Sequence, residues 1–564
     1  MRNSLIITGI ILLLTTCSTA PEYDVILMGG TIYNGSGEDP FIADIGITGN
    51  SISFIGDLSK AKAKTQHDVS GLAVSPGFIN MLSWATESLI IDGNAQSDIR
   101  QGVTLEVMGE GFSMGPLNDQ MKEEMRKDVK RSGLDHEIGW TTLGEYLEFL
   151  ERSGSAVNVA SFVGATTLRI HEMGYANRPP TPEELERMEA LARQAMEEGA
   201  LGIGSSLIYA PASYSSTEEL IALCKAASAY KGMYITHMRS EGDNIFSAVN
   251  ETIRIAREAN IPAEIYHLKF AGQRNWNKID SVINMIEAAR REGLRITTDM
   301  YTYTAGATGL DASMPTWLQE GGINQWIARM KDPKTRSKAL REMREPSEAW
   351  ENLLLLAGNP DNVLLVGFSN DSLKRFTGMT LKQVADIHKK SAEETAMDLV
   401  CADSTRVGTV YFLMKEENVK RQIALPYMSF GSDAEAPATE GHFLKYNPHP
   451  RAYGNFSRLI GKYVREEKVI TLQEAIRKLT LLPATNLKIE KRGLLQPGYF
   501  ADIAIFDPAK VQDHATFEKP HQYSTGMVHV FVNGVQVLND GEHTGAKPGR
   551  VVRGPGWQGK QKSF

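Results

Sequence analysis

The chain has 564 residues, of which 42% are hydrophobic and 23% charged, values ordinary for a globular protein of roughly two to four domains. This composition excludes a mainly disordered, collagen-like or multi-span membrane protein. The formal net charge is −8, from 60 Lys+Arg and 68 Asp+Glu, so charge gives no indication of a nucleic-acid partner. Three cysteines are too few for a disulfide framework.

The first 16 residues predict an export signal, so we treat residues 1–22 as signal and tether. Arg2 supplies a positive charge, and residues 5–14 form an apolar run that is too short to span a bilayer. The sequence Leu14-Thr-Thr-Cys17 is similar to a bacterial lipobox. We therefore expect lipid attachment at Cys17 and anchoring of the exported protein at the cell envelope, which means the outer membrane or periplasm if the cell is Gram-negative. Ordinary secretion after cleavage at Ala20 and an uncleaved anchor are the alternatives.

The two ends of the remaining chain share one pattern. Residues 23–75 alternate polar and apolar side chains between Gly and Asn turns, which predicts short antiparallel strands. Residues 500–506 and 528–537 follow the same pattern, and Asn533-Gly534 is a hairpin signal. We expect residues 23–75 and 486–564 to form one small β-sandwich domain.

The middle of the chain, residues 76–485, alternates short apolar strands with helical stretches. Eight strand–helix units of this kind predict an α/β fold, a (β/α)8 barrel of the TIM type. About 120 residues separate the last two strands, and the charged, helix-prone part of this gap predicts a helical insertion at about 313–375. The predicted strands are 77–82, 103–108, 157–163, 201–207, 233–238, 263–269, 295–303 and 424–431.

Two histidines end neighbouring predicted strands. In a barrel of this type the chemistry takes place at the carboxyl ends of the strands, and His237 and His267 end the fifth and sixth. A single histidine in this place is more often structural. Two on adjacent strands indicate a shared metal ion, because imidazole is a common zinc ligand.

Other polar residues end the remaining strands. Asp433 follows the eighth strand, where it is a candidate general base, or alternatively caps the next helix. Glu110 lies between two glycines after the second strand, as a third, oxygen ligand or as a solvated loop residue. Cationic and phenolic side chains near the same carboxyl ends of the strands could bind an anionic group of a substrate, although each could equally form a surface ion pair. They are Lys269, Tyr301, Tyr303, Arg239 and Arg451.

Several motifs carry a family resemblance. They are residues 74–79, 102–104, 111–116, 209–214, 236–239, 267–269, 299–303, 431–433, 449–454 and 493–498. On these motifs the chain resembles the amidohydrolase superfamily, and more narrowly the N-acyl-D-amino-acid deacylases (D-aminoacylases). The likeness runs from about residue 23 to 556. It implies a (β/α)8 barrel with a β domain built from both termini.

The resemblance also implies an activity and its residues. His237 and His267 match the histidines of a tightly held zinc ion, and Asp433 matches the catalytic aspartate. Lys269, Tyr301 and Arg451 match residues that hold a substrate carboxylate. The implied reaction is hydrolysis of the amide bond of an N-acyl-D-amino acid to a carboxylate and a free D-amino acid. Metal-activated water attacks, and Asp433 acts as general base and acid. The implied partner is a small N-acylated amino acid with a free carboxylate.

Three departures from the family pattern affect the expected metal centre and substrate contacts. Leu82 and Trp84 occupy the places of a His-x-His pair, which predicts one metal site rather than two. Glu110 replaces a cysteine ligand. A carboxylate is a competent but harder ligand, which leaves another divalent metal as an alternative to zinc. Ala307 replaces a serine that contacts the substrate carboxylate.

Two other functions stay open from the sequence. One is an amidohydrolase that acts on another N-blocked, peptide or cyclic amide. The other is a non-catalytic binding protein on the same fold, supported only by the missing His-x-His pair. Asp433 beside two histidines counts against a pure binder, which needs no base at the metal. The acyl group, the preferred side chain and the oligomeric state are not predicted.

Overall fold

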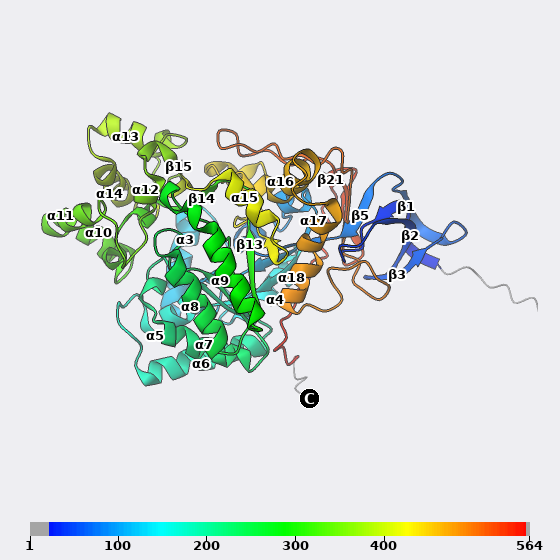
Figure 1. Ribbon diagram of the computed structural model, residues 1–564, viewed down its shortest axis with the longest axis horizontal. Helices are drawn as coiled ribbons and strands as arrows, with labels where there is room; N and C mark the ends of the chain where they lie inside the picture. Colours follow the sequence, from blue (N-terminus) through cyan, green and yellow to red (C-terminus); the bar gives the residue numbers. More distant parts are fainter. Residues whose placement is uncertain (1–21, 560–564) are drawn as a thin grey trace, which may run out of the picture.

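The computed structural model describes residues 22–559, so the predicted lipid site at Cys17 lies outside the described residues. Every helix within this range is too short or too polar to cross a bilayer. A central α/β body carries a β domain at one end and the helices of an insertion at the other (Figure 1).

The central body is a ring of parallel strands. Strands β6, β7 and β8 form one sheet, and β9 to β13 with β17 form another. Strands β8 and β9 are consecutive pieces of one strand position, and Met81 N donates to Phe430 O at 3.1 Å, so the first and last strands adjoin. This arrangement is the expected barrel. The strands are β6 (Phe78–Asn80), β7 (Val103–Met108), β8 (Asn158–Ser161), β9 (Val163–Gly164), β10 (Gly202–Ser206), β11 (Met233–His237), β12 (Ala263–Ile265), β13 (Ile296–Met300) and β17 (Met428–Phe430).

Helices cover the outside of the ring. In α6 (Pro182–Glu197) the Thr181 side chain accepts from Glu184 N while the Glu184 side chain bonds back, and Pro182 occupies the first turn. The inward face of this helix is apolar and buried, as the helical period requires. The other helices of the body are α1 (Ser88–Ile91), α2 (Gln96–Ile99), α3 (Asp119–Arg131), α4 (Leu143–Ser153), α5 (Ala165–Met173), α7 (Thr217–Ser228), α8 (Ile245–Glu258), α9 (Ile279–Arg291), α15 (Glu416–Ile423), α16 (Arg451–Arg458), α17 (Leu472–Leu479) and α18 (Leu481–Leu487).

The β domain joins the two ends of the chain in one nine-stranded sheet. Strand β5 pairs in parallel with β1 and antiparallel with β18, so an N-terminal strand lies beside a C-terminal one. The predicted turn joins β19 to β20, with φ of +49° at Asn533 and +79° at Gly534. The strands are β1 (Glu22–Ile32), β2 (Phe41–Thr48), β3 (Ser51–Gly56), β4 (Lys62–Asp68), β5 (Ala73–Pro76), β18 (Ile503–Phe506), β19 (Met527–Val532), β20 (Val535–Asn539) and β21 (Glu542–His543).

The insertion between β13 and β17 is longer than the expected segment and is not only helical. A three-stranded antiparallel sheet, β14–β16–β15, accompanies its helices. Strand β14 has the sequence Ala-Gly-Ala-Thr-Gly, which has little strand propensity, so its pairing with β16 determines its structure. The elements are β14 (Ala305–Gly309), α10 (Ile323–Lys331), α11 (Pro333–Glu342), α12 (Leu353–Ala357), β15 (Val363–Gly367), α13 (Leu381–His388), α14 (Ala392–Asp403) and β16 (Gly408–Phe412).

Candidate active site

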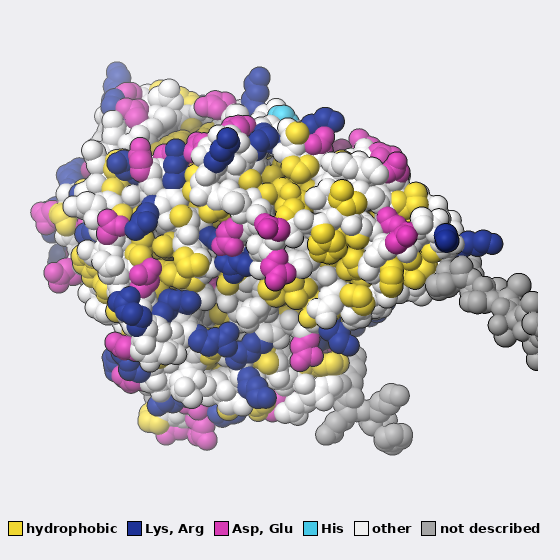
Figure 2. Space-filling view, turned by 45° about the vertical axis from the view of Figure 1, so that its right-hand side comes forward, with side chains coloured by type: hydrophobic (Ala, Val, Ile, Leu, Met, Phe, Trp, Pro, Cys, Tyr) yellow, Lys and Arg dark blue, Asp and Glu magenta, His cyan; other side chains and the backbone are white. Residues whose placement is uncertain are grey.

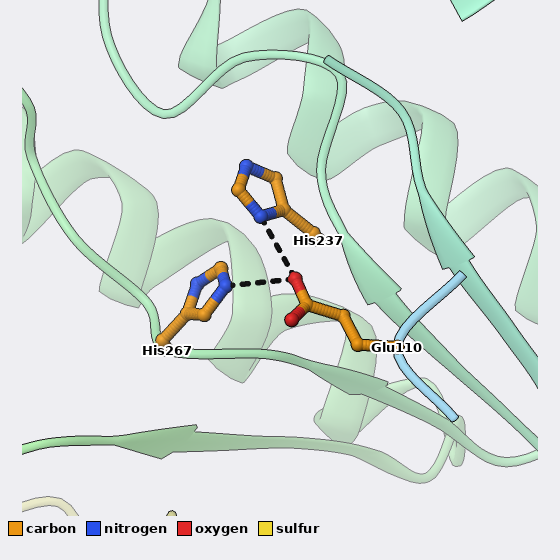
Figure 3. A group of neighbouring side chains, drawn as sticks. All are labelled: Glu110, His237 and His267. Atoms are coloured by element: carbon orange, nitrogen blue, oxygen red, sulfur yellow. Dashed lines mark hydrogen bonds and ion pairs between the residues drawn. The ribbon is translucent and has the colours of Figure 1, made fainter. Parts of the chain in front are cut away.

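Three of the predicted site residues converge at the carboxyl ends of their strands (Figure 3). His237 is the last residue of β11, His267 follows β12, and Glu110 follows β7. Glu110 Oε1 lies 3.0 Å from His237 Nδ1 and 3.1 Å from His267 Nε2. The glycine at 111 is needed for this approach, because its φ is +71° and a Cβ there would lie 2.5 Å from the Cβ of Ser206.

This group fits a metal ion in its donor chemistry. One ligand atom from each of the three side chains lies within 4.8 Å of the others, and all three residues are buried. Two imidazoles and a carboxylate are a ligand set that zinc takes in catalytic sites. Although burial raises the pKa of the Glu110 carboxyl, hydrogen bonds from His237 and His267 outweigh it and hold that pKa well below its usual range. The carboxyl is therefore ionised, as a metal ligand must be.

Glu241 lies on the outer side of both histidines and contacts His267, a role that the sequence did not predict. Its Oε1 lies 2.9 Å from His267 Nδ1 and accepts a 2.6 Å hydrogen bond from Lys269 Nζ. Its Oε2 lies 3.6 Å from His237 Nε2. A carboxylate on one imidazole nitrogen orients the ring so that the other nitrogen faces the metal position. Glu241 lies four residues after His237, which was the only signal for it in the sequence.

Asp433 lies beside the same group, on the loop after β17. Its backbone is left-handed, with φ of +48°, and its N–H donates to Leu82 O at 2.8 Å. Arg451 Nη2 lies 2.9 Å from Asp433 Oδ2. Burial raises the pKa of the Asp433 carboxyl even though Arg451 acts to lower it. A raised pKa suits a group that both takes and returns a proton near neutral pH.

Two of the three predicted carboxylate-holding residues have unpaired donors. Within residues 22–559, Tyr301 Oη and Arg451 Nε and Nη1 are buried and have no hydrogen-bond partner. The Arg451 guanidinium lies 4.5 Å from the centre of the Tyr301 ring. Buried donors without partners are costly, so an anionic ligand group at this place would complete them. Lys269 differs, because its ammonium is already paired with Glu241.

Seven of the nine candidate residues line one cavity of about 390 Å³ together with Glu241: the three metal-ligand candidates, Asp433, Lys269, Tyr301 and Arg451. Ala307 lines it too, where the family pattern has a serine. Tyr303 and Arg239 have other partners: Tyr303 Oη lies 3.4 Å from Asp513 Oδ2, and Arg239 pairs with Glu251. The walls are largely apolar and include Trp84, Phe112, Ile208, Tyr209, Leu353, Tyr411 and Leu413.

Known proteins are similar to this chain in sequence and in fold. Residues 427–538 match the model of the amidohydrolase family. The chain is 35% identical over 536 residues, 95% of its length, to D-aminoacylase from Alcaligenes xylosoxydans xylosoxydans and covers 98% of that protein. A solved D-aminoacylase, described as having a binuclear metal centre with one-metal activation and second-metal attenuation, is 33% identical. It superposes with a TM-score of 0.77 over 94% of this chain and 100% of that one.

A second solved relative contains bound ligands. N-acyl-D-glutamate deacylase from Bordetella bronchiseptica, in complex with zinc and a phosphonate that mimics the tetrahedral intermediate, is 28% identical. Its TM-score is 0.77 over 94% of this chain and 100% of that one. The matches to these three relatives extend over almost the whole chain, so they include the barrel, the insertion and the β domain together.

Proposed function

The chain belongs to the D-aminoacylase family of amidohydrolases, and from this premise we propose that it is a zinc-dependent hydrolase that releases D-amino acids from N-acyl-D-amino acids. The observation that carries the proposal is the convergence in one cavity of a Glu-His-His group with an Asp-Arg pair. The first group supplies metal ligands. The second supplies a proton carrier beside free donors for an anionic group.

Glu110, His237 and His267 would hold the zinc ion, with Glu241 orienting His267. When bound, zinc supplies Lewis-acid activation of the amide carbonyl and of a water molecule. Asp433 moves the protons. Arg451 is paired with Oδ2, which leaves Oδ1 to take a proton from the attacking water and return it to the leaving nitrogen. The bond between the carbonyl carbon and nitrogen breaks, giving a carboxylate and a free amine.

Arg451 and Tyr301 would orient the substrate by its free carboxylate. Their buried donors, which have no partner among residues 22–559, are the chemical complement of that group. Fixing the carboxylate holds the amide near the metal group and Asp433, which lowers the entropic part of the barrier. Lys269 contributes positive charge to the same wall while it remains bonded to Glu241.

Metal dependence tests the proposal directly. Purified protein is treated with a chelator, dialysed, and assayed for amine release from N-acetyl-D-methionine before and after zinc is returned. We expect activity to disappear in the apo protein and to return with zinc, while a His237→Ala variant remains inactive in both conditions. Undiminished turnover by protein that demonstrably lacks metal would refute the proposal.

We further propose that the protein is exported and anchored by lipid at Cys17. The support is the sequence alone: the short apolar run and the lipobox-like residues that end at this cysteine. Metabolic labelling with a fatty acid, in cells that express the full chain, should label the wild type and not a Cys17→Ser variant. Equal labelling of the two would refute lipid attachment at this residue.

A further inference from the structure

Trp84 contacts the outer oxygen of the Glu110 carboxylate. Its indole Nε1 donates to Glu110 Oε2 at 3.0 Å. The other oxygen, Oε1, faces His237, His267 and, at 3.3 Å, the Ser206 hydroxyl. The two oxygens therefore have separate partners: the inner one faces the metal group and the outer one is bonded to the indole.

The backbone fixes the position of this indole. Trp84 N donates to Ala434 O at 2.9 Å, and Ser83 N donates to Val107 O at 2.9 Å. The loop after β6 is thus held on one side by β7, which precedes Glu110, and on the other by the residue next to Asp433. The indole is half-buried and lines the cavity.

The hydrogen bond constrains how the carboxylate can bind a cation. A free carboxylate rotates and can chelate one ion with both oxygens, or bridge two ions. The indole N–H group, which carries a positive partial charge, is bonded to Oε2. Oε1 is therefore the oxygen left for a cation. A second cation on the Oε2 side would meet this N–H group. In the part of the chain that the structure describes, Glu110, His237 and His267 form the only group of three possible ligands.

We propose that Trp84 is a positioning residue of the metal centre, which fixes Glu110 as a one-oxygen ligand and limits the centre to one ion. The inference rests on the ligand role proposed above for Glu110, His237 and His267. It gives this protein a different response to metal from that of the D-aminoacylase described with second-metal attenuation. Turnover here stays unchanged in excess zinc.

The first test separates the N–H group from the ring. Trp84→Phe keeps an aromatic ring and removes the donor, whereas Trp84→Gln removes the ring and keeps an N–H donor. Zinc affinity is measured by chelator competition, and the ligand field by the visible spectrum of the cobalt-substituted protein. We expect Trp84→Phe to bind zinc about 10- to 100-fold more weakly, with an altered cobalt spectrum, and Trp84→Gln to lie closer to the wild type.

Controls exclude a general effect on the fold. Phe112→Leu alters another aromatic wall residue that is 40% exposed, and it should leave zinc affinity and the cobalt spectrum unchanged. Thermal unfolding of each apo variant shows whether the substitution acts on the fold instead. A Trp84→Phe protein with wild-type affinity and spectrum would overturn the inference.

The second test counts ions. Zinc content after equilibration with excess metal and desalting should be one per chain for the wild type. It should be higher for Trp84→His, which replaces an indole that can only donate with an imidazole that can bind metal beside Oε2. Two ions in the wild type, or attenuation of its turnover by excess zinc, would overturn the inference and leave the proposed function intact. A wild type that binds no zinc would instead refute the proposed function.

Discussion

Asp433 is placed by its backbone as much as by its side chain. A left-handed conformation at a non-glycine residue costs about 1–3 kcal/mol, and here Leu82 O and the Arg451 guanidinium hold it in place. Strain of this kind is retained where it directs a functional group. In this site it directs a carboxylate, 11% exposed, toward the cavity that the histidines line.

Replacing this carboxylate tests its role as proton carrier. Asp433→Asn keeps the size and tolerates the left-handed backbone, but its amide takes up no proton. We expect the variant to retain its zinc, measured by elemental analysis, and to lose about 10²- to 10⁴-fold in kcat. Near-normal kcat in a zinc-loaded variant would refute the assignment.

The hydroxyl of Tyr301 is predicted to act on substrate alone. Because it bonds to no group among the described residues, Tyr301→Phe removes no internal hydrogen bond. KM for an N-acyl-D-amino acid should rise about 10- to 100-fold, the value of a hydrogen bond to a charged group, while the unfolding midpoint stays unchanged. An unchanged KM would place the substrate carboxylate elsewhere.

At the scale of elements, a buried polar network joins the first and last barrel strands. Asn80 of β6 donates to Glu106 Oε2 at 2.8 Å and to Ser432 Oγ at 2.9 Å, and Ser432 N donates to Asn80 Oδ1 at 2.8 Å. The same Asn80 amide nitrogen also donates to Asp98 Oδ1, on α2, at 3.3 Å. The network fixes the residue directly before Asp433.

This network predicts a pH dependence of stability. Burial raises the pKa of Glu106 to about 7, and burial and Glu106 raise the pKa of Asp98 well above its usual value. Between about pH 4 and 7 the unfolded chain releases protons that the folded pair keeps. The contribution of this pair to the free energy of unfolding is therefore complete below the unfolded pKa values of the two carboxyls. It is lost as pH rises, by up to about 1.4 kcal/mol per pH unit for each proton.

Urea unfolding of the wild type and of Asp98→Asn/Glu106→Gln across this range measures the effect. The free energy of unfolding of the wild type should fall more steeply with pH than that of the variant. Parallel profiles would show that the pair keeps no extra proton.

Sequence patterns predicted these elements well where local signals were strong. The strands that lead to Glu110, His237, His267 and Asp433 were predicted within a few residues, because continuous apolar runs mark buried parallel strands. The insertion was less predictable, since β14 depends on its partner for its strand structure. Trp84 and Glu241 were not predicted as parts of the metal site, because their roles arise from contacts across loops that no local pattern encodes.

At the scale of the whole molecule, a buried ion pair of the β domain lies where this domain meets the barrel. Arg492 pairs with Asp502, whose Oδ1 accepts from Asn533 N at 2.7 Å and whose backbone O accepts from Gly77 N at 2.8 Å. Gly77 leads directly into β6, so the pair lies where both ends of the chain meet the barrel. Elsewhere, acidic and basic side chains are interspersed over the face shown in Figure 2.

Breaking this pair should destabilise the protein without changing the site. Arg492→Met leaves the Asp502 carboxylate buried without its cation and should cost about 3–5 kcal/mol in the free energy of unfolding. Arg492→Met/Asp502→Asn should recover part of this loss, with kcat unchanged in both variants at low temperature. A single variant as stable as the wild type would show that the pair does not stabilise this junction.

The proposed function requires a stereospecific hydrolase. The most direct measurement is the rate of amine release by the zinc-loaded protein from matched N-acetyl-D- and N-acetyl-L-amino acids with apolar, polar and acidic side chains. Turnover confined to D-isomers, and lost in Asp433→Asn, is the predicted result. Equal turnover of L-isomers, or none on either series with zinc bound, would contradict it.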